Sequence, residues 1–236
     1  MTVVLPDVIS TTIFRNGYHD EGLTRMLLTQ LKPGSVFFDV GAHFGYFTLL
    51  AARLVGGGGV VHAFEPSSAT FRILKANTRK RKNITVNNVA VFRTSGEVSF
   101  NEYSLESSAY ATVFSPRFET ATQKPASRKT RSVPAVSLDA YVEKTASRPD
   151  FIKIDAESSE LPILEGMSNV LSRWRPALSL EVGDVDGAEA PCTSRELISY
   201  LLERGYQAFQ HRSGRIEPHL AKDRYTYDNL LFIANS

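Results

Sequence analysis

An acid and two glycines near the start of the chain have the spacing of a cofactor-binding turn. Segment 36–48 opens with an apolar run, passes through Asp39, Gly41 and Gly45, and leads into the apolar-periodic segment 46–55. The apolar run predicts a strand buried on both faces, and the periodic segment predicts a helix. Such a strand, turn and helix present backbone amides to a nucleotide-like ligand, and the glycines let it approach closely.

The spacing within this turn distinguishes two classes of cofactor. Asp39, Gly41 and Gly45 form the pattern D-x-G-x-x-x-G, whereas a dinucleotide-binding turn has G-x-G-x-x-G. A carboxylate before the first glycine would repel a pyrophosphate, but it attracts the ammonium and sulfonium groups of S-adenosylmethionine. Glu65 ends a second apolar segment 24 residues after Gly41, where an acid accepts ribose hydroxyls. An NAD enzyme would use Glu65 as well, so Asp39 and the glycine spacing decide for S-adenosylmethionine.

An alternation of apolar strands and amphipathic helices surrounds this turn. The expected strands are 36–40, 60–65, 84–91, 151–155 and 177–182, and the expected helices are 21–32, 46–55, 67–82, 158–171 and 194–203. This order predicts an α/β fold with a doubly wound, mostly parallel sheet. Segments 206–210 and 229–234 follow each other without a helix between them, which predicts an antiparallel pair at one edge.

Two regions fall outside this alternation. Residues 1–20 are short apolar pieces around Asn16-Gly17, which we interpret as a small hairpin, and with the following helix they would cover the pocket as segment 1–32. Segment 92–138 is an insertion of extended pieces, with a polar loop at 115–131 that carries a net charge of +4. The loop is either solvated or a lid over an anionic substrate. We expect one domain over 1–236.

Composition excludes several classes of protein. A net charge of +2 over 236 residues is too small to indicate a nucleic-acid partner. The single cysteine, Cys192, excludes an intramolecular disulfide framework. Neither a signal peptide nor an apolar run of membrane-spanning length is visible, so we expect a cytoplasmic protein without a membrane partner. The oligomeric state is left open.

Seven short motifs occur in the order and spacing of a known family. They are the segments 39–45, 62–66, 88–91, 137–139, 152–157, 160–166 and 176–181. Together they resemble the FkbM family of S-adenosylmethionine-dependent methyltransferases, from about residue 31 onward. The resemblance implies the class I methyltransferase fold, which is Rossmann-like with a seven-stranded sheet. It also implies O-methylation of a sugar, polyketide, nucleoside or other natural product.

The resemblance also implies roles for individual residues. Glu65 would accept the ribose hydroxyls, and Asn88 and the backbone of Val89 would meet the adenine edge, bordered by Pro66 and Ser67. The methionine part would be held by Asp39 and by the backbone of the turn residues Gly41, Ala42, His43, Phe44 and Gly45. Asp155 is expected to be a further cofactor-binding residue.

The chain departs from the family pattern at two positions. His43 stands where the family more often has asparagine, and Ser158 stands where the family has the glycine of D-x-E-G. His43 lies in the cofactor turn and would affect how that turn is held. Ser158 would change the backbone around Glu157.

Four residues are candidates for the base that activates a substrate hydroxyl. Asp155, Glu157 and Glu181 end predicted strands on the cofactor side, and His43 suits proton transfer near pH 7. Structural alternatives are helix capping by the first two acids, pairing of Glu181 with Lys153, and a backbone bond from His43. The three acids could instead bind a divalent cation such as magnesium that lowers the hydroxyl pKa.

The sequence therefore favours an O-methyltransferase acting on a hydroxylated small molecule. An NAD(P)-binding oxidoreductase is disfavoured because G-x-G-x-x-G is absent. A cofactor-binding protein without activity is a further alternative, against which the retained acids argue. Methylation of nucleic-acid bases is disfavoured because no Asn-Pro-Pro-Tyr sequence follows the fourth strand.

Overall fold

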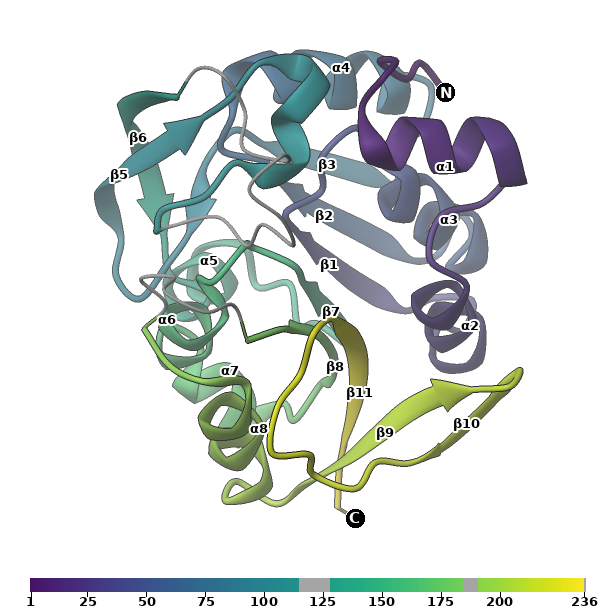
Figure 1. Ribbon diagram of the computed structural model, residues 1–236, viewed down its shortest axis with the longest axis vertical. Coiled ribbons are helices and arrows are strands. Elements are labelled where there is room, and N and C mark those ends of the chain that lie inside the picture. Colours follow the sequence, from purple (N-terminus) through teal and green to yellow (C-terminus); the bar gives the residue numbers. More distant parts are fainter. Residues whose placement is uncertain (115–127, 185–190, 236) are drawn as a thin grey trace.

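An eight-stranded sheet crosses the molecule, with helices packed on both faces (Figure 1). The computed structural model describes residues 1–114, 128–184 and 191–235. Neighbouring residues of one strand point into different hydrophobic clusters: Phe37 lies in one and Phe38 in the other. Phe151 and Ile152 divide in the same way. The apolar run at 36–40 is therefore a strand that buries both faces, as predicted.

The strand order is that of a doubly wound parallel sheet with an antiparallel end. The parallel strands are, in spatial order, β3 (Ile84–Asn87), β2 (Val60–Phe64), β1 (Val36–Val40), β7 (Phe151–Ile154) and β8 (Ala177–Val182). The antiparallel strands that follow are β11 (Asp228–Ala234), β9 (Tyr206–Arg212) and β10 (Arg215–Pro218). With β10 the sheet has eight strands, one more than the seven expected. A tight turn with positive φ at Ser213 and Gly214 folds β10 back onto β9.

Helices of the two sheet faces come from different parts of the chain. On one face lie α2 (Glu21–Gln30) and α3 (Tyr46–Leu54), whose apolar residues pack with Phe37 and Phe151. On the other lie α5 (Leu138–Thr145), α6 (Glu160–Glu165), α7 (Ser168–Arg173) and α8 (Ser194–Leu202). Helix α4 (Ser68–Thr78) follows β2 and is capped by Ser67. No helix among the described residues is long and apolar enough to cross a membrane.

The single helix expected over 158–171 is wrong. It is divided into α6 and α7 at Gly166, because this residue packs directly against the backbone of Phe92 and Arg93. The carbonyl oxygen of Gly166 also accepts a hydrogen bond from the N–H of Asp139 at the start of α5. The break thus joins the helical layer to the segment that leads into the insertion.

The N-terminal hairpin is also wrong, because residues 8–16 form a helix, α1 (Val8–Asn16). The carboxylate of Asp7 accepts a hydrogen bond from the N–H of Ser10 at one end, and Gly17 adopts φ 79° at the other. An aspartate N-cap and a left-handed glycine at the C-terminus are standard helix boundaries. The pair Asn16-Gly17 therefore ends a helix rather than turning a hairpin.

The insertion and the two residues before it form a second sheet of three strands. In spatial order these are β4 (Ala90–Val91), β6 (Lys129–Val136) and β5 (Gly96–Glu102), and the 3-10 helix η1 (Leu105–Tyr110) follows β5 in the chain. The strand expected over 84–91 is thus split between two sheets. Of the polar loop expected at 115–131, residues 129–131 belong to β6, and 115–127 lie outside the described residues.

We predict that Gly166→Ala destabilises the protein by about 1–3 kcal/mol, because its Cβ would overlap the carbonyl oxygen of Phe92. Gly57→Ala is the matched control, since nothing lies within 4 Å of a Cβ at that position. It should change the free energy of unfolding by no more than about 0.5 kcal/mol. Urea denaturation of both variants measures the difference, and equal stabilities would contradict the described packing.

Candidate active site

A cavity lies where the parallel strands β1, β2 and β7 end. Its walls include Gly41, His43, Glu65, Pro66 and Asp155 together with apolar side chains from the insertion. A smaller cavity adjoins it and shares Gly41, His43 and Asp155. The carboxyl ends of parallel strands are where α/β sheets bind ligands. The structure therefore brings most of the predicted cofactor residues to one place.

Glu65 is held rigidly in the wall of the larger cavity. Its Oε2 accepts a hydrogen bond from the N–H of His43 at 3.0 Å, and its Oε1 accepts one from the N–H of Ser67 at 2.9 Å. Burial raises the pKa of Glu65 to about 7, although these two N–H donors oppose the shift. The remaining lone pairs of a buried carboxylate can accept hydroxyl groups.

The cofactor turn depends on backbone conformations that only some residues tolerate. Gly41 has φ 73°, and its Cα lies so close to the carbonyl oxygen of Asp155 that a Cβ would overlap it. His43 has φ 50°, in the left-handed region where asparagine is among the favoured residues. This explains why a family in which asparagine is common at this position can also accommodate a polar aromatic ring. Gly45, with φ 91°, begins α3.

Asp39 lies beneath the turn rather than in either cavity wall. It has no exposed surface, and it accepts a hydrogen bond from the hydroxyl of Thr48. Its Oδ1 lies 3.4 Å from Nζ of Lys153, which also lies 3.3 Å from Oδ2 of Asp155 and donates to the carbonyl oxygen of Gly41 at 2.8 Å. Of the two acids that contact Lys153, only Asp155 lines the cavities, and Asp39 acts on the turn through Lys153.

Lys153 organises the cofactor turn, a role that the sequence reasoning missed. Pairing with Glu181 was one alternative drawn from the sequence, whereas the ion pairs of Lys153 in the structure are with Asp39 and Asp155. Burial alone would lower the pKa of Lys153, and the two carboxylates outweigh that effect and raise it. A lysine inside the buried strand β7 was the available signal, because buried ammonium groups are almost always paired.

His43 is a neutral imidazole with a defined tautomer. The hydroxyl of Ser108 donates to the carbonyl oxygen of Leu105, so it accepts from Nε2 of His43 at 2.8 Å. Burial, reinforced by Lys153, lowers the pKa of His43 to about 3. Nδ1 therefore carries the lone pair, and it has no hydrogen-bond partner among the described residues. The ring joins the cofactor turn to η1.

The residues expected at the adenine edge, Asn88 and Val89, have structural contacts. The amide of Asn88 donates to the carbonyl oxygens of Glu65 and Pro66, at 2.8 and 3.0 Å, and so supports the turn after β2. Val89 packs against the main core. The next two residues, Ala90 and Val91 of β4, line the cavity instead. The chain crosses from one sheet to the other here, which shifts the wall by two residues.

The three acids predicted as catalytic candidates meet beside the cavity. One carboxylate oxygen each from Asp155, Glu157 and Glu181 lies within 4.8 Å of the other two. Glu157 and Ser158 both have left-handed backbones, with φ 46° and 76°. The family glycine at the second of these positions is the residue that adopts such a conformation at least cost. The structure thus brings Asp155, Glu157 and Glu181 together despite the serine at 158.

Comparison with known sequences identifies the family of this chain. The family profile of the methyltransferase FkbM domain matches residues 39–208. This chain belongs to the FkbM family of methyltransferases. The match begins at Asp39 of the cofactor turn and includes Glu65 and all three acids of the cluster.

Two characterised relatives share part of their length with this FkbM-family chain. The 31-O-demethyl-FK506 methyltransferase FkbM of Streptomyces tacrolimicus is 33% identical over 182 residues, which is 67% of this chain and 69% of that protein. The hexuronic acid methyltransferase AglP of Haloferax volcanii is 26% identical over 154 residues, or 64% of this chain. The latter alignment spans 58% of AglP.

Solved structures show the same fold. A methyltransferase FkbM from Methylobacillus flagellatus KT superposes with a TM-score of 0.53 at 17% identity, over 89% of this chain and 50% of that one. The precorrin-6y C5,15-methyltransferase of Geobacter metallireducens GS-15 gives 0.51 at 13% identity, over 100% and 94%. The predicted class I methyltransferase fold is therefore confirmed.

We predict that Gly41→Ala weakens S-adenosylmethionine binding at least about tenfold, because relieving the overlap with Asp155 displaces the turn. Gly34→Ala is the matched control: Gly34 also has a positive φ, of 91°, but nothing lies within 4 Å of its Cβ position. Both variants should lose melting temperature, and only Gly41→Ala should lose affinity in titration calorimetry. Equal affinities would show that the contact with Asp155 does not shape the cofactor site.

Proposed function

We propose that this protein transfers the methyl group of S-adenosylmethionine to a hydroxyl of a small molecule. The observation that carries the proposal is the position of Asp155. This residue lines both cavities and also belongs to the cluster with Glu157 and Glu181. A candidate cofactor site and a group of proton acceptors therefore share one residue, which would bring a hydroxyl held by the acids close to the methyl donor.

The donors and acceptors around the cavities fit the cofactor. Glu65 would accept the ribose hydroxyls, and the apolar wall formed with Ala90 and Val91 suits the adenine ring. The smaller cavity, which contains Asp155, would receive the methionine part near the N-terminus of α3. The carboxylate of Asp155 attracts the ammonium group of the cofactor. The N–H groups at the start of the helix suit the carboxylate of the methionine part.

The acid cluster would supply what the cofactor does not. When bound, S-adenosylmethionine provides the methyl group and its own leaving group. A hydroxyl is a weak nucleophile at neutral pH, and a positioned base accelerates its reaction by about 10²–10⁴-fold. Asp155, Glu157 and Glu181 can orient the hydroxyl and accept its proton as the new bond forms. His43 is less suited, because its Nε2 is bound to Ser108 and its low pKa makes it a weak base.

The characterised relatives support an oxygen atom as the acceptor. One is named for methylating the 31-O position of demethyl-FK506 and the other for methylating a hexuronic acid. Neither name describes a nucleic acid as the acceptor. The alternatives of an NAD(P) oxidoreductase or an inactive binding protein have no comparable support.

A divalent cation is the second way in which the cluster could act. Three carboxylate oxygens within 4.8 Å of one another have the spacing and chemistry of ligands for magnesium. A bound cation would lower the pKa of the hydroxyl and so reduce the contribution of a side-chain base to the rate. Activity after treatment with a strong chelator distinguishes the two mechanisms.

We predict that affinity for S-adenosylmethionine decreases as the pH falls below about 7, since only ionised Glu65 accepts two hydroxyl protons. The loss should approach tenfold per pH unit. In the free protein the folded state holds this proton more tightly than the unfolded chain does. The free energy of unfolding should therefore fall as the pH rises from about 4.5 to 7.

Glu65→Gln is the control for this pH dependence. It should bind S-adenosylmethionine about 10- to 100-fold more weakly at pH 8. Its affinity should vary less between pH 5.5 and 8 than that of the wild type. Calorimetry in matched buffers measures both, and parallel pH profiles for the two proteins would refute the role of Glu65.

We predict that Glu181→Gln and Glu157→Gln each lower kcat by about 10²–10⁴-fold while S-adenosylmethionine affinity is retained. Asp155→Asn should lower both quantities because Asp155 also contacts the cofactor cavities. Transfer of labelled methyl groups to a panel of hydroxylated metabolites measures kcat. Glu143→Gln, on the exposed side of α5, is the control and should have wild-type activity. Wild-type kcat in all three cluster variants would exclude the cluster from catalysis.

A further inference from the structure

His43 stands where the two cavities meet. Like Gly41 and Asp155, it lines both of them. Its backbone N–H donates to Oε2 of Glu65 at 3.0 Å, which fixes the residue to the wall of the larger cavity. The ring of Phe44 packs against the imidazole, with 3.9 Å between the two ring centroids. These contacts hold the imidazole in one position between the cavities.

Two acceptors face Nε2 of this imidazole. The hydroxyl of Ser108 lies 2.8 Å from Nε2 and donates its own hydrogen to the carbonyl oxygen of Leu105. Oδ2 of Asp7 lies 3.9 Å from Nε2 and has no hydrogen-bond partner among the described residues. Ser108 therefore binds a hydrogen on Nε2 directly, and the carboxylate, which is beyond hydrogen-bonding distance, favours that hydrogen by its charge.

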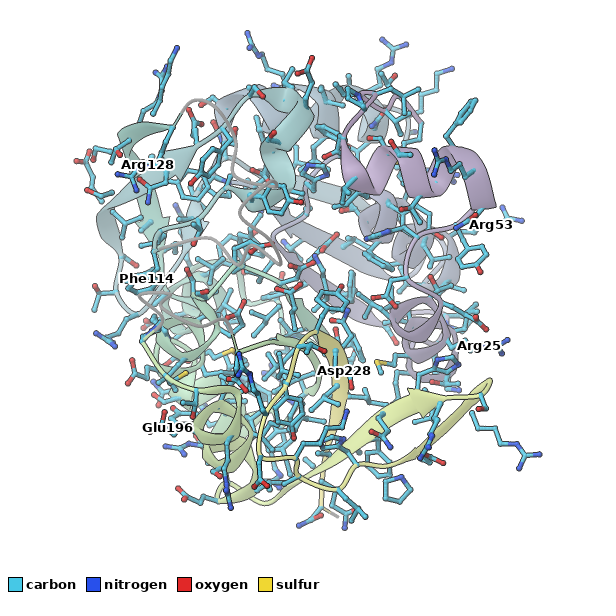
Figure 2. The ribbon with its side chains drawn as sticks, in the orientation of Figure 1. Arg25, Arg53, Phe114, Arg128, Glu196 and Asp228 are labelled. Carbon is cyan, nitrogen blue, oxygen red and sulfur yellow. The ribbon has the colours of Figure 1, made fainter. Side chains whose placement is uncertain are left out.

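Ser108 reaches the cofactor turn from a distant part of the chain. It belongs to η1 in the insertion, which Figure 2 shows at the labelled side chains of Phe114 and Arg128. Ser108 is only 6% exposed and lines the larger cavity. Its hydrogen bond to the imidazole joins residues that are 65 positions apart. The insertion is thus connected directly to the cofactor turn.

The second ring nitrogen, Nδ1, is a buried acceptor without a partner. With the hydrogen on Nε2, Nδ1 carries a lone pair, and none of the described residues donates to it. A buried acceptor left in this state costs about 1–3 kcal/mol. A ligand that brings a hydrogen-bond donor to the junction of the cavities would remove that cost.

The ammonium group is the donor of S-adenosylmethionine that fits this place. In the proposed arrangement the ribose hydroxyls face Glu65, and the methionine part enters the smaller cavity, whose wall contains both Asp155 and His43. An ammonium group has three hydrogens, so one bound to Asp155 leaves two for other acceptors. The carbonyl oxygen of Gly41, in the same wall, already accepts a hydrogen bond from Nζ of Lys153 at 2.8 Å.

We propose that Nδ1 of His43 accepts a hydrogen bond from the ammonium group of the cofactor, and that Ser108 is a positioning residue that keeps this lone pair available. The inference rests on the proposed function, which places the methionine part in the smaller cavity. It gives His43 a role other than proton transfer. It also makes η1 part of the cofactor site, through a residue that never touches the ammonium group itself.

Nitrogen NMR of the isotope-labelled protein tests the role of His43. The chain has five histidines, and His43→Asn identifies the signals of this ring by their loss. The free wild type should show a hydrogen on Nε2 and none on Nδ1. Saturation with S-adenosylhomocysteine should shift the Nδ1 signal toward that of a hydrogen-bonded acceptor, whereas deamino-S-adenosylhomocysteine, which lacks only the amino group, should not. A hydrogen on Nδ1, or equal shifts with the two ligands, would overturn the proposal.

Calorimetry with the same two ligands tests the role of Ser108. The wild type should prefer S-adenosylhomocysteine, and Ser108→Ala should reduce that preference by about two- to tenfold, the value of one hydrogen bond. Ser104→Ala is the matched control, because Ser104 precedes η1, is exposed and makes no capping bond with its side chain. It should keep the wild-type preference.

A merely structural role of Ser108 would weaken both ligands equally, so an unchanged preference in Ser108→Ala would overturn its positioning role. The failure of the proposed function is a separate outcome. If S-adenosylhomocysteine does not bind the wild type at all, the cofactor assignment is wrong. If it binds and the Nδ1 signal does not respond, the cofactor assignment stands and the hydrogen bond to His43 is refuted.

Discussion

The ammonium group of Lys153 is the interaction on which the site depends. It lies inside the central strand β7 and contacts two carboxylates and the carbonyl oxygen of Gly41. A buried charge without such partners would be prohibitively costly, so the ends of β1 and β7 must stay together for the fold to persist. The close approach of Gly41 to the backbone of Asp155 follows from the same arrangement. The contacts of Lys153 therefore stabilise the core and fix the shape of the cofactor turn at the same time.

From that centre, polar contacts extend to segments far apart in the chain. His43 connects the cofactor turn to Ser108 in the insertion, and its Nε2 lies 3.9 Å from the buried carboxylate of Asp7 before α1. Ile9 of α1 lines both cavities. On the opposite side, Asp20 and Asn229 join residues separated by 209 positions. The walls of the site are thus supplied by parts of the chain that a parallel sheet alone would not bring together.

Features determined by local pattern could be predicted from the sequence, and those determined by distant partners could not. The apolar run at 36–40 and the acid at Glu65 identified the central strands and a wall of the cavity. Helix α1 was missed because its apolar residues resemble short strands, while its boundaries depend on Asp7 and Gly17. Asp39 was expected at the cofactor, yet its orientation is set by Lys153, which lies 114 residues later. The division at Asn88 and Val89 arises from pairing with β6, which no nearby residue encodes.

The placement of β11 has a consequence for synthesis on the ribosome. This strand lies between β8 and β9 although it is made after both. Until it emerges, the hydrogen-bonding edge of β8 is uncovered, and an uncovered edge readily pairs with other chains. Nascent molecules that have completed every other strand of the large sheet are consequently still open to aggregation, and chaperones that shield strand edges would matter most at that late stage.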